Sequence, residues 1–204
     1  IFLNLVLLPL NFISDFWLEH RFGLANETVF NWLLDEVKGL LLAVIFFLPL
    51  GLAVYAFIRL TNNYWWVYAA IVWSLYSVFI AFIAPVVIMP LFNKFEPLKD
   101  EQLAQEIKQL AAKARLNITQ VLVTDMSKRT KKANAYFAGL GRTKRVVLGD
   151  TVVNNFTPLE ILAVVAHELG HWSKGHINKN LWLNVLVGFF SFYAVNLFLN
   201  ATVN

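Results

Sequence analysis

Three long stretches almost free of charged residues constrain the fold of this chain more than any other feature. Residues 39–60 are apolar, with Arg59 as their single charge. No residue from 60 to 93 carries a charge, and residues 181–199 are uncharged as well. Because a helix rises about 1.5 Å per residue, some 20 residues cross the roughly 30 Å of membrane hydrocarbon. The stretches therefore predict membrane-spanning helices rather than buried helices of a large soluble protein.

Composition supports the same class of protein. Of the 204 residues, 15% are charged and 58% are hydrophobic. An ordinary soluble domain has roughly 25% charged residues. The chain contains no cysteine, which excludes disulfides and zinc sites with thiolate ligands. We predict a mainly α, multi-span helical membrane protein in contact with the lipid bilayer.

The first two spans are expected to form an antiparallel hairpin. Only a few polar residues, Thr61–Asn63, separate them. The second span runs from about residue 64 to residue 89 and begins with an aromatic cluster of Tyr and Trp, which is typical of a membrane interface. Pro49 and Pro85 predict a bend in each span.

The sequence divides into three parts. Residues 1–89 form a membrane region with the end of one span, a polar loop and the helical hairpin. Residues 90–180 form a polar domain, and residues 181–204 form a further span, after which we expect the chain to be truncated. Most Lys and Arg residues fall in the polar domain. Since cytoplasmic loops are rich in Lys and Arg, we expect this domain on the cytoplasmic side.

The polar domain combines helical and strand patterns. Residues 99–115 carry apolar side chains at helical spacing, and residues 121–124 have the composition of a strand. Residues 133–140 and 144–148 are predicted to be two strands joined by a turn at 141–143. The fold class is therefore completed by a small β-hairpin.

A second helix of the polar domain has clear start and stop signals. Thr157 and Glu160 have the spacing of a capping box, and Pro158 occupies the first helical position. Gly175 is a typical residue after a helix end. We predict a helix from Thr157 to about Lys174.

This helix carries the motif H-E-L-G-H. His167 and His171 are four residues apart, so both imidazoles leave the same face of the helix. That spacing suits two ligands of one zinc ion, and Glu168 is placed to act as the general base on an attacking water. The pattern predicts a zincin-like helix and a zinc hydrolase. The alternative is a pair of structural histidines on a buried helix.

A catalytic zinc usually has three protein ligands, and the third is not evident. His176 lies about 500° around a helix from His171, which turns it away from the zinc face. The longer pattern with a third histidine would need that residue at Ile177. Glu160 lies on the right face but about 10.5 Å along the axis from His167. No Asp or Glu follows Glu168, so we expect a glutamate from a helix beyond residue 204.

The segment A-N-A-Y-F-A-G, residues 133–139, suits an edge strand that holds an extended substrate by backbone hydrogen bonds. Asn134 could then bind a substrate carbonyl or amide group. The alternative, that Tyr136 and Phe137 are ordinary strand residues, stays open.

Several segments together resemble the type I CAAX prenyl proteases, which are integral-membrane zinc endopeptidases. They are S-K-R-T-K-K-A-N-A-Y-F-A-G-L-G-R-T-K-R-V-V-L at 127–148, H-E-L-G-H-W at 167–172, P-L-F-N-K-F-E-P-L at 90–98 and R-F-G-L-A-N at 21–26. The resemblance covers most of the chain. It implies helices around a large chamber and removal of the C-terminal tripeptide after a prenylated cysteine.

The resemblance also implies residue roles and two departures. It assigns one zinc ion to His167 and His171, catalysis to Glu168, and substrate binding to Asn134, Ala135 and Tyr136. The family's third ligand, a glutamate on a later helix, and a later histidine are absent from these 204 residues. Gly149 stands where a larger apolar residue is expected.

Three functions remain open at the level of sequence. The first is a membrane zinc endopeptidase that cleaves prenylated CAAX proteins, located in the endoplasmic reticulum membrane or the bacterial inner membrane. The second is a bacterial relative that degrades damaged membrane proteins. The third is a non-catalytic scaffold that has lost full zinc ligation. Binding of nucleic acid is not expected, because Lys128–Lys132 is the only dense group of cations.

Overall fold

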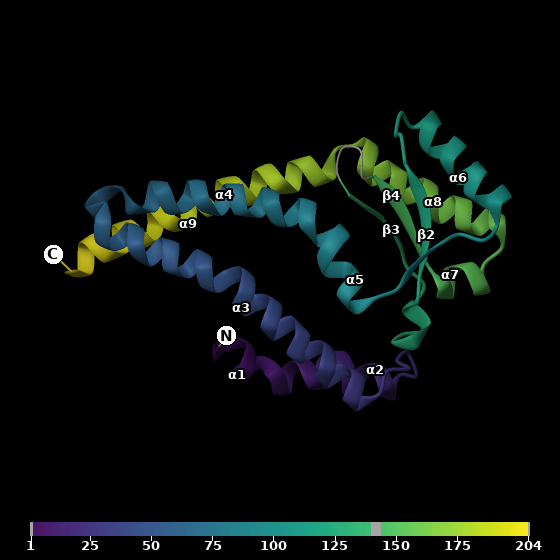
Figure 1. The fold of residues 1–204 in the computed structure, drawn as a ribbon, viewed down its shortest axis with the longest axis horizontal. Coiled ribbons are helices and arrows are strands. Elements are labelled where there is room, and N and C mark those ends of the chain that lie inside the picture. Colours follow the sequence, from purple (N-terminus) through teal and green to yellow (C-terminus); the bar gives the residue numbers. More distant parts are fainter. Residues whose placement is uncertain (1, 140–143, 204) are drawn as a thin grey trace. The chain divides into compact units, whose positions relative to one another are not determined.

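The computed structural model describes residues 2–139 and 144–203, apart from the side chains at 2–5, 176–178 and 203. The chain divides into two compact units (Figure 1). The helical unit contains Lys38–Ala81 and Ile177–Asn204, and the sheet unit contains Phe2–Val37 and Phe82–His176. The predicted turn at residues 141–143 lies outside the described residues.

Three helical segments of the described chain are long and apolar enough to cross a membrane, which confirms the three predicted spans. They are Val29–Leu60, Asn62–Phe92 and Lys179–Thr202. The helices that build them are α3 (Val29–Leu60), α4 (Trp65–Ile83), α5 (Met89–Phe92) and α9 (His176–Val203). A single 3-10 turn, Asn62–Tyr64, separates α3 from α4. The short link between the first two spans thus has the expected length.

Helix α3 begins well before the apolar stretch at residue 39. The Thr28 hydroxyl accepts a hydrogen bond from the backbone N–H of Asn31 at 3.3 Å, as an N-terminal cap does. The polar loop expected before the hairpin is therefore short, since only residues 22–28 separate α3 from the preceding helix. The chain before it forms α1 (Phe2–Asn11), a π-helical segment (Phe12–Trp17) and α2 (Leu18–Arg21).

Proline has different effects in the first two spans. Helix α3 continues through Pro49. The second span changes to a wider π-helical turn, Ala84–Ile88, at Pro85. Proline lacks an N–H group and clashes with the preceding turn, which favours such a local widening. The irregularity expected near Pro85 is present.

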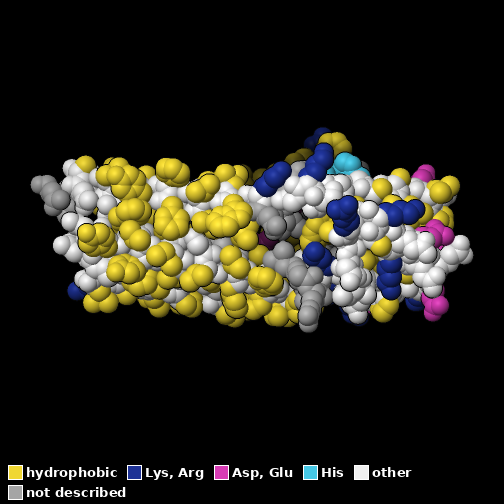
Figure 2. All heavy atoms as spheres, turned by 90° about the horizontal axis from the view of Figure 1, so that it is seen from above, with side chains coloured by type: hydrophobic (Ala, Val, Ile, Leu, Met, Phe, Trp, Pro, Cys, Tyr) yellow, Lys and Arg dark blue, Asp and Glu magenta, His cyan; other side chains and the backbone are white. Residues whose placement is uncertain are grey.

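Within the helical unit, small residues allow α4 and α9 to pack closely. A Cβ atom at Gly188 would lie 2.6 Å from Cδ1 of Trp73. The Trp73 indole N–H donates to Oδ1 of Asn184 at 3.2 Å. Ala69 and Ala70 are completely buried. Figure 2 shows hydrophobic side chains over these helices, as expected for surfaces that face lipid.

The sheet unit contains a mixed four-stranded sheet, larger than the predicted hairpin. Its strands are β1 (Phe95–Pro97), β2 (Gln120–Thr124), β3 (Ala135–Ala138) and β4 (Arg145–Gly149), in the order β1-β2-β4-β3. Strands β3 and β4 are antiparallel, with Tyr136 opposite Val147, and β2 and β4 are parallel. The predicted β3–β4 pair is present, whereas β1 is a strand that was not predicted.

Helices cover one face of this sheet. They are α6 (Glu101–Lys113) and α8 (Pro158–Ser173), with the short α7 (Asp150–Asn155) beside β4. Their buried residues form one core with Val146 and Leu148 of β4 and Val121 of β2. Alternate residues, including Leu122 and Val147, form a smaller cluster on the opposite face. Strand periodicity therefore assigns each residue of the hairpin to one face.

Candidate metal and substrate site

The start of α8 is fixed by the predicted capping box. The Thr157 hydroxyl accepts from the Glu160 backbone N–H, and a Glu160 carboxylate oxygen accepts from the Thr157 N–H at 2.8 Å. The hydrogen bond from the backbone of Thr157, with a second one from its hydroxyl, lowers the pKa of Glu160. The Glu160 carboxylate is thus engaged in hydrogen bonds at the start of the helix, away from the motif. This agrees with its exclusion as a metal ligand.

Two faces of α8 have different tasks. Ile161, Val165 and Leu169 are buried against the sheet. His167 and His171 lie about 200° and 240° around the helix axis from Val165. Both histidines are exposed. Packing of the first face therefore leaves the two imidazoles outside the core, on the exposed side of the helix.

The geometry of the two histidines fits a shared metal ion. Their Nε2 atoms lie 3.2 Å apart, and their rings are inclined at 81°. Two nitrogen ligands at the usual distances from a tetrahedral zinc ion would be about 3.3 Å apart. The donor atoms therefore converge as a zinc ion would require. Glu168, half-buried, follows His167 directly on the same helix.

A third ligand is not found among the described residues, where no group of three or more His, Asp or Glu side chains could hold a metal. The side chain of His176, whose helical position turns it away from the zinc face, lies outside the described ones. The two histidines thus form an incomplete ligand set within the part of the chain that the structure describes.

Strand β3 is an edge strand, as the sequence suggested. The backbone N–H of Gly149 donates to the carbonyl of Asn134 at 2.8 Å, and Ala135 lies opposite Leu148. Hydrogen-bonded and non-hydrogen-bonded pairs alternate along antiparallel strands. Asn134 and Tyr136 therefore direct their backbone groups toward β4. Ala135 and Phe137 direct theirs toward the free edge.

The three residues that the resemblance assigned to substrate binding have different surroundings. The Ala135 side chain belongs to the core beneath α8. Tyr136 packs in the smaller cluster on the other sheet face, and its hydroxyl contacts Sδ of Met89 at 4.0 Å. Burial raises the pKa of Tyr136, an effect that Arg145 partly opposes. The Asn134 side chain is exposed.

Trp172 connects the motif helix to the hairpin. Its ring meets that of Phe137 edge to face, with centroids 5.6 Å apart. The ammonium group of Lys144 lies 5.4 Å from the centroid of the same indole. The side chain next to His171 therefore contacts both strand β3 and the residue before β4. Sequence reasoning did not single out Trp172, and a large aromatic residue beside a predicted ligand was the available signal.

At Gly149, strand β4 lies very close to Met126 and to the residue before β3. A Cβ atom here would lie 2.8 Å from Sδ of Met126 and 3.1 Å from the carbonyl oxygen of Asn134. The larger apolar residue expected from the resemblance would not fit unless these groups moved. Glycine at this position allows the close contact of β4 with the start of β3.

Comparisons with known proteins agree with these features. Residues 1–94 match the family model described as CAAX prenyl protease N-terminal, five membrane helices, and residues 97–204 match Peptidase family M48. CAAX prenyl protease 1 of Saccharomyces cerevisiae is 43% identical over 85% of this chain and 39% of its own length. The uncharacterized metalloprotease YhfN of Bacillus subtilis is 34% identical over 98% of this chain and 47% of its own length.

The crystal structure of S. mikatae Ste24p has the same fold, with a TM-score of 0.82 and 39% identity. The match covers 94% of this chain and 45% of that chain. The chain thus spans less than half the length of these relatives. An H-E-x-x-H helix beside an edge strand, together with three apolar spans, defines the class of helical membrane metallopeptidases. The chain belongs to peptidase family M48.

Proposed function

We propose that this chain is part of an integral-membrane zinc endopeptidase that removes the C-terminal tripeptide of prenylated CAAX proteins. The convergence of the His167 and His171 Nε2 atoms at 3.2 Å carries this proposal. His167 and His171 would hold zinc, and Glu168 would be the catalytic base. When bound, zinc lowers the pKa of water and polarises a peptide carbonyl.

Glu168 performs the proton transfers of the proposed reaction. Its carboxylate takes a proton from the attacking water and passes it to the nitrogen of the leaving amine. The new C–O bond forms first, and the peptide C–N bond breaks once the nitrogen has been protonated. A carboxylate directly after the first histidine can reach both the water and the amine without moving its helix.

Strand β3 holds the substrate in the proposed complex. An extended peptide can add to the free edge by backbone hydrogen bonds. The alternation along β3 assigns these bonds to Ala135 and Phe137, whose backbone groups point away from β4. The Asn134 side chain, which is exposed, can contribute a polar contact next to them. Tyr136 would support the strand from its other face.

The substrate and the membrane are part of the proposal. A relative with 43% identity carries the name CAAX prenyl protease 1, which supports a prenylated protein substrate. The apolar spans support a position inside a bilayer. We place the polar domain of residues 90–180 on the cytoplasmic side of the endoplasmic reticulum membrane or a bacterial inner membrane. The excess of Lys and Arg in that domain supports this orientation.

A second function is favoured by one observation. The bacterial relative YhfN matches 98% of this chain and is named a metalloprotease without reference to CAAX proteins. A peptidase that degrades damaged membrane proteins would use the same residues. It differs in substrate only, so a direct comparison of substrates separates the two functions.

The test combines zinc content with peptide cleavage by the full-length protein that contains this chain. Elemental analysis should find one zinc ion, and His167→Ala should remove it. Glu168→Gln should retain zinc and lower kcat about 10²- to 10⁴-fold, since a general base contributes this factor. Glu160→Gln is a matched control on the same helix, because glutamine also completes a capping box, and it should cleave normally.

Substrate choice decides between the candidate functions. A farnesylated CAAX peptide should be cleaved much faster than its unprenylated form. Equal cleavage of both, together with cleavage of an unfolded membrane protein, would favour quality control. Absence of zinc from the full-length protein would favour the non-catalytic scaffold. We also expect the 204-residue chain alone to hold zinc more weakly than the full-length protein, because the third ligand, a glutamate, is proposed to lie beyond residue 204.

A further inference from the structure

The motif R-F-G-L-A-N, residues 21–26, pairs with a distant segment of the chain. The proposed reaction does not use this pairing. The Asn26 N–H donates to the Arg129 carbonyl, and the Lys131 N–H donates to the Leu24 carbonyl, both at 2.8 Å. These bonds flank an isolated antiparallel bridge between Ala25 and Thr130. The loop of residues 22–28 therefore pairs with the segment that leads into strand β3.

Arg129 strengthens this pairing with its side chain. Its guanidinium donates to the Asp35 carboxylate, with Nε 2.9 Å from Oδ2, and to the Phe92 carbonyl at 2.6 Å. Nε also lies 3.3 Å from Oε1 of Glu27. One partly buried cation thus joins the loop, the start of α3 and the end of α5. Arginine suits this role because its planar group presents several donors in fixed directions.

The charges around Arg129 help to hold the loop at this position. Burial raises the pKa of Glu27, and Asp35 adds to this effect, while Arg129 opposes it. Two carboxylates therefore share one guanidinium in a partly desolvated place. Without Arg129 both carboxylates would lose this cation, which would weaken the docking of the loop.

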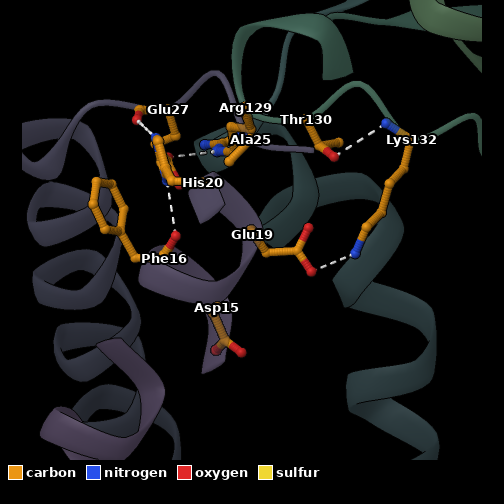
Figure 3. Close-up of a pocket in the computed structure, with 9 residues that line it drawn as sticks. All are labelled: Asp15, Phe16, Glu19, His20, Ala25, Glu27, Arg129, Thr130 and Lys132. Carbon is orange, nitrogen blue, oxygen red and sulfur yellow. Dashed lines mark hydrogen bonds and ion pairs between the residues drawn. The ribbon is translucent and has the colours of Figure 1, made fainter. Parts of the chain in front are cut away.

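A second ion pair holds the same segment nearer to β3. The Lys132 ammonium lies 2.6 Å from Oε1 of Glu19, across the polar pocket shown in Figure 3. The Lys132 carbonyl accepts from the Thr151 hydroxyl at 3.0 Å. The segment from Arg129 to Asn134 is thus tied to α2 and the loop on one side, and to β4 and α7 on the other.

We propose that the loop of residues 22–28, with Glu19, Arg129 and Lys132, is a fixed clamp that positions the substrate strand. The inference rests on the proposed function, because it takes β3 as the strand that binds substrate. Side chains and backbone groups alternate with a period of two along a strand. A slip of one residue at the start of β3 would turn the Ala135 and Phe137 backbone groups away from the free edge.

The clamp predicts that this loop stays docked during turnover, which a disulfide can test. Ala25 and Thr130 form a non-hydrogen-bonded antiparallel pair, whose Cα atoms are typically about 4.5 Å apart. This spacing permits a disulfide. The chain has no cysteine of its own, so Ala25→Cys with Thr130→Cys can be introduced into the full-length protein, with cysteines outside this chain replaced by serine.

The oxidised double variant should cleave an extended CAAX peptide as fast as its reduced form. Loss of cleavage on oxidation, with zinc retained and activity restored by reduction, would overturn the fixed clamp, because the loop would then have to undock. Failure of the unmodified full-length protein to hold zinc or to cleave any peptide is a separate result. It would overturn the proposed function and the clamp with it.

A charge exchange tests whether the clamp positions substrate. Lys132→Glu should raise KM for a long extended peptide about tenfold or more and leave cleavage of a short peptide that does not reach β3 unchanged. Adding Glu19→Lys restores the ion pair with opposite polarity and should restore KM. Lys131→Glu is the matched control, since the neighbouring Lys131 is exposed. Equal KM values for Lys132→Glu and the unmodified protein would overturn the inference.

Discussion

At the residue scale, neighbouring side chains on one turn of α8 have separate tasks. His171 is exposed, whereas Trp172 contacts Phe137 and Lys144 on the hairpin. Leu169 and Val165 are buried in the core. The position of His171 therefore depends on apolar packing of the residues beside it. Trp172 provides that packing at the end of the helix, after the core residues.

Replacement of Trp172 tests this dependence. Trp172→Ala removes an edge-to-face ring contact and a cation–π contact, which together contribute about 1–2 kcal/mol. The free energy of unfolding in detergent should fall by this amount. Trp172→Phe keeps an aromatic ring against Phe137 and should recover much of the loss. Chemical denaturation followed by circular dichroism measures both variants, and equal stability of Trp172→Ala and the unmodified protein would contradict the packing role.

At the scale of elements, close packing at Gly149 joins three segments. Strand β4 passes so near the start of β3 that a Cβ atom would meet the Asn134 carbonyl. The same carbonyl accepts the Gly149 N–H, so it cannot move away without losing a ladder hydrogen bond. Met126 is flexible and can move. An added Cβ atom would therefore crowd the Asn134 backbone, which favours glycine at this position.

Gly149→Ala should destabilise the sheet unit by about 1–3 kcal/mol, the usual cost of inserting a group into a packed site. Gly39→Ala is the control, because nothing lies within 4 Å of a Cβ atom there and alanine favours a helix. The control should be neutral or slightly stabilising. Thermal unfolding of both variants in the same detergent compares them, and equal destabilisation would show that the Gly149 contact is not the cause.

At the scale of the whole molecule, the chain combines apolar spans with a charged sheet unit. Lys and Arg gather over the sheet unit in Figure 2. A membrane protein with this asymmetry is expected to keep its basic part in the cytoplasm. Residues 90–180 contain two N-glycosylation sequences with exposed asparagines, Asn117-Ile118-Thr119 and Asn155-Phe156-Thr157, which make this orientation measurable.

Expression of the full-length protein in cells with endoplasmic reticulum should leave both sequences unmodified. The enzyme that attaches N-linked glycans acts on the lumenal side only, so a cytoplasmic domain does not meet it. Digestion with an endoglycosidase should have the same effect on the electrophoretic mobility of the unmodified protein and of an Asn117→Gln, Asn155→Gln double variant, because other N-glycosylation sequences lie outside residues 90–180. A mobility change that disappears in the Asn117→Gln, Asn155→Gln double variant would reverse the proposed orientation. Residues 90–174 behind a cleavable signal peptide provide the control, which should be glycosylated.

Features that depend on near neighbours could be predicted from the sequence. The three spans follow from the length of apolar stretches, and α8 follows from its capping box. The convergence of His167 and His171 follows from helical spacing alone. Each of these features depends on residues that are close together in the sequence. The geometry of one helical turn or the thickness of a bilayer then determines the structure.

Other features needed distant parts of the chain. The sequence did not reveal β1, the parallel pairing of β2 with β4, or the contact of Trp172 with Phe137. Arg129 and Asp35 are 94 positions apart and are joined only in the folded chain. Pairing of this kind depends on how loops close and on which surfaces become buried. Local sequence patterns contain no information about either. Helix spacing therefore decided the convergence of the two histidines, whereas tertiary packing decided which edge strand stays free.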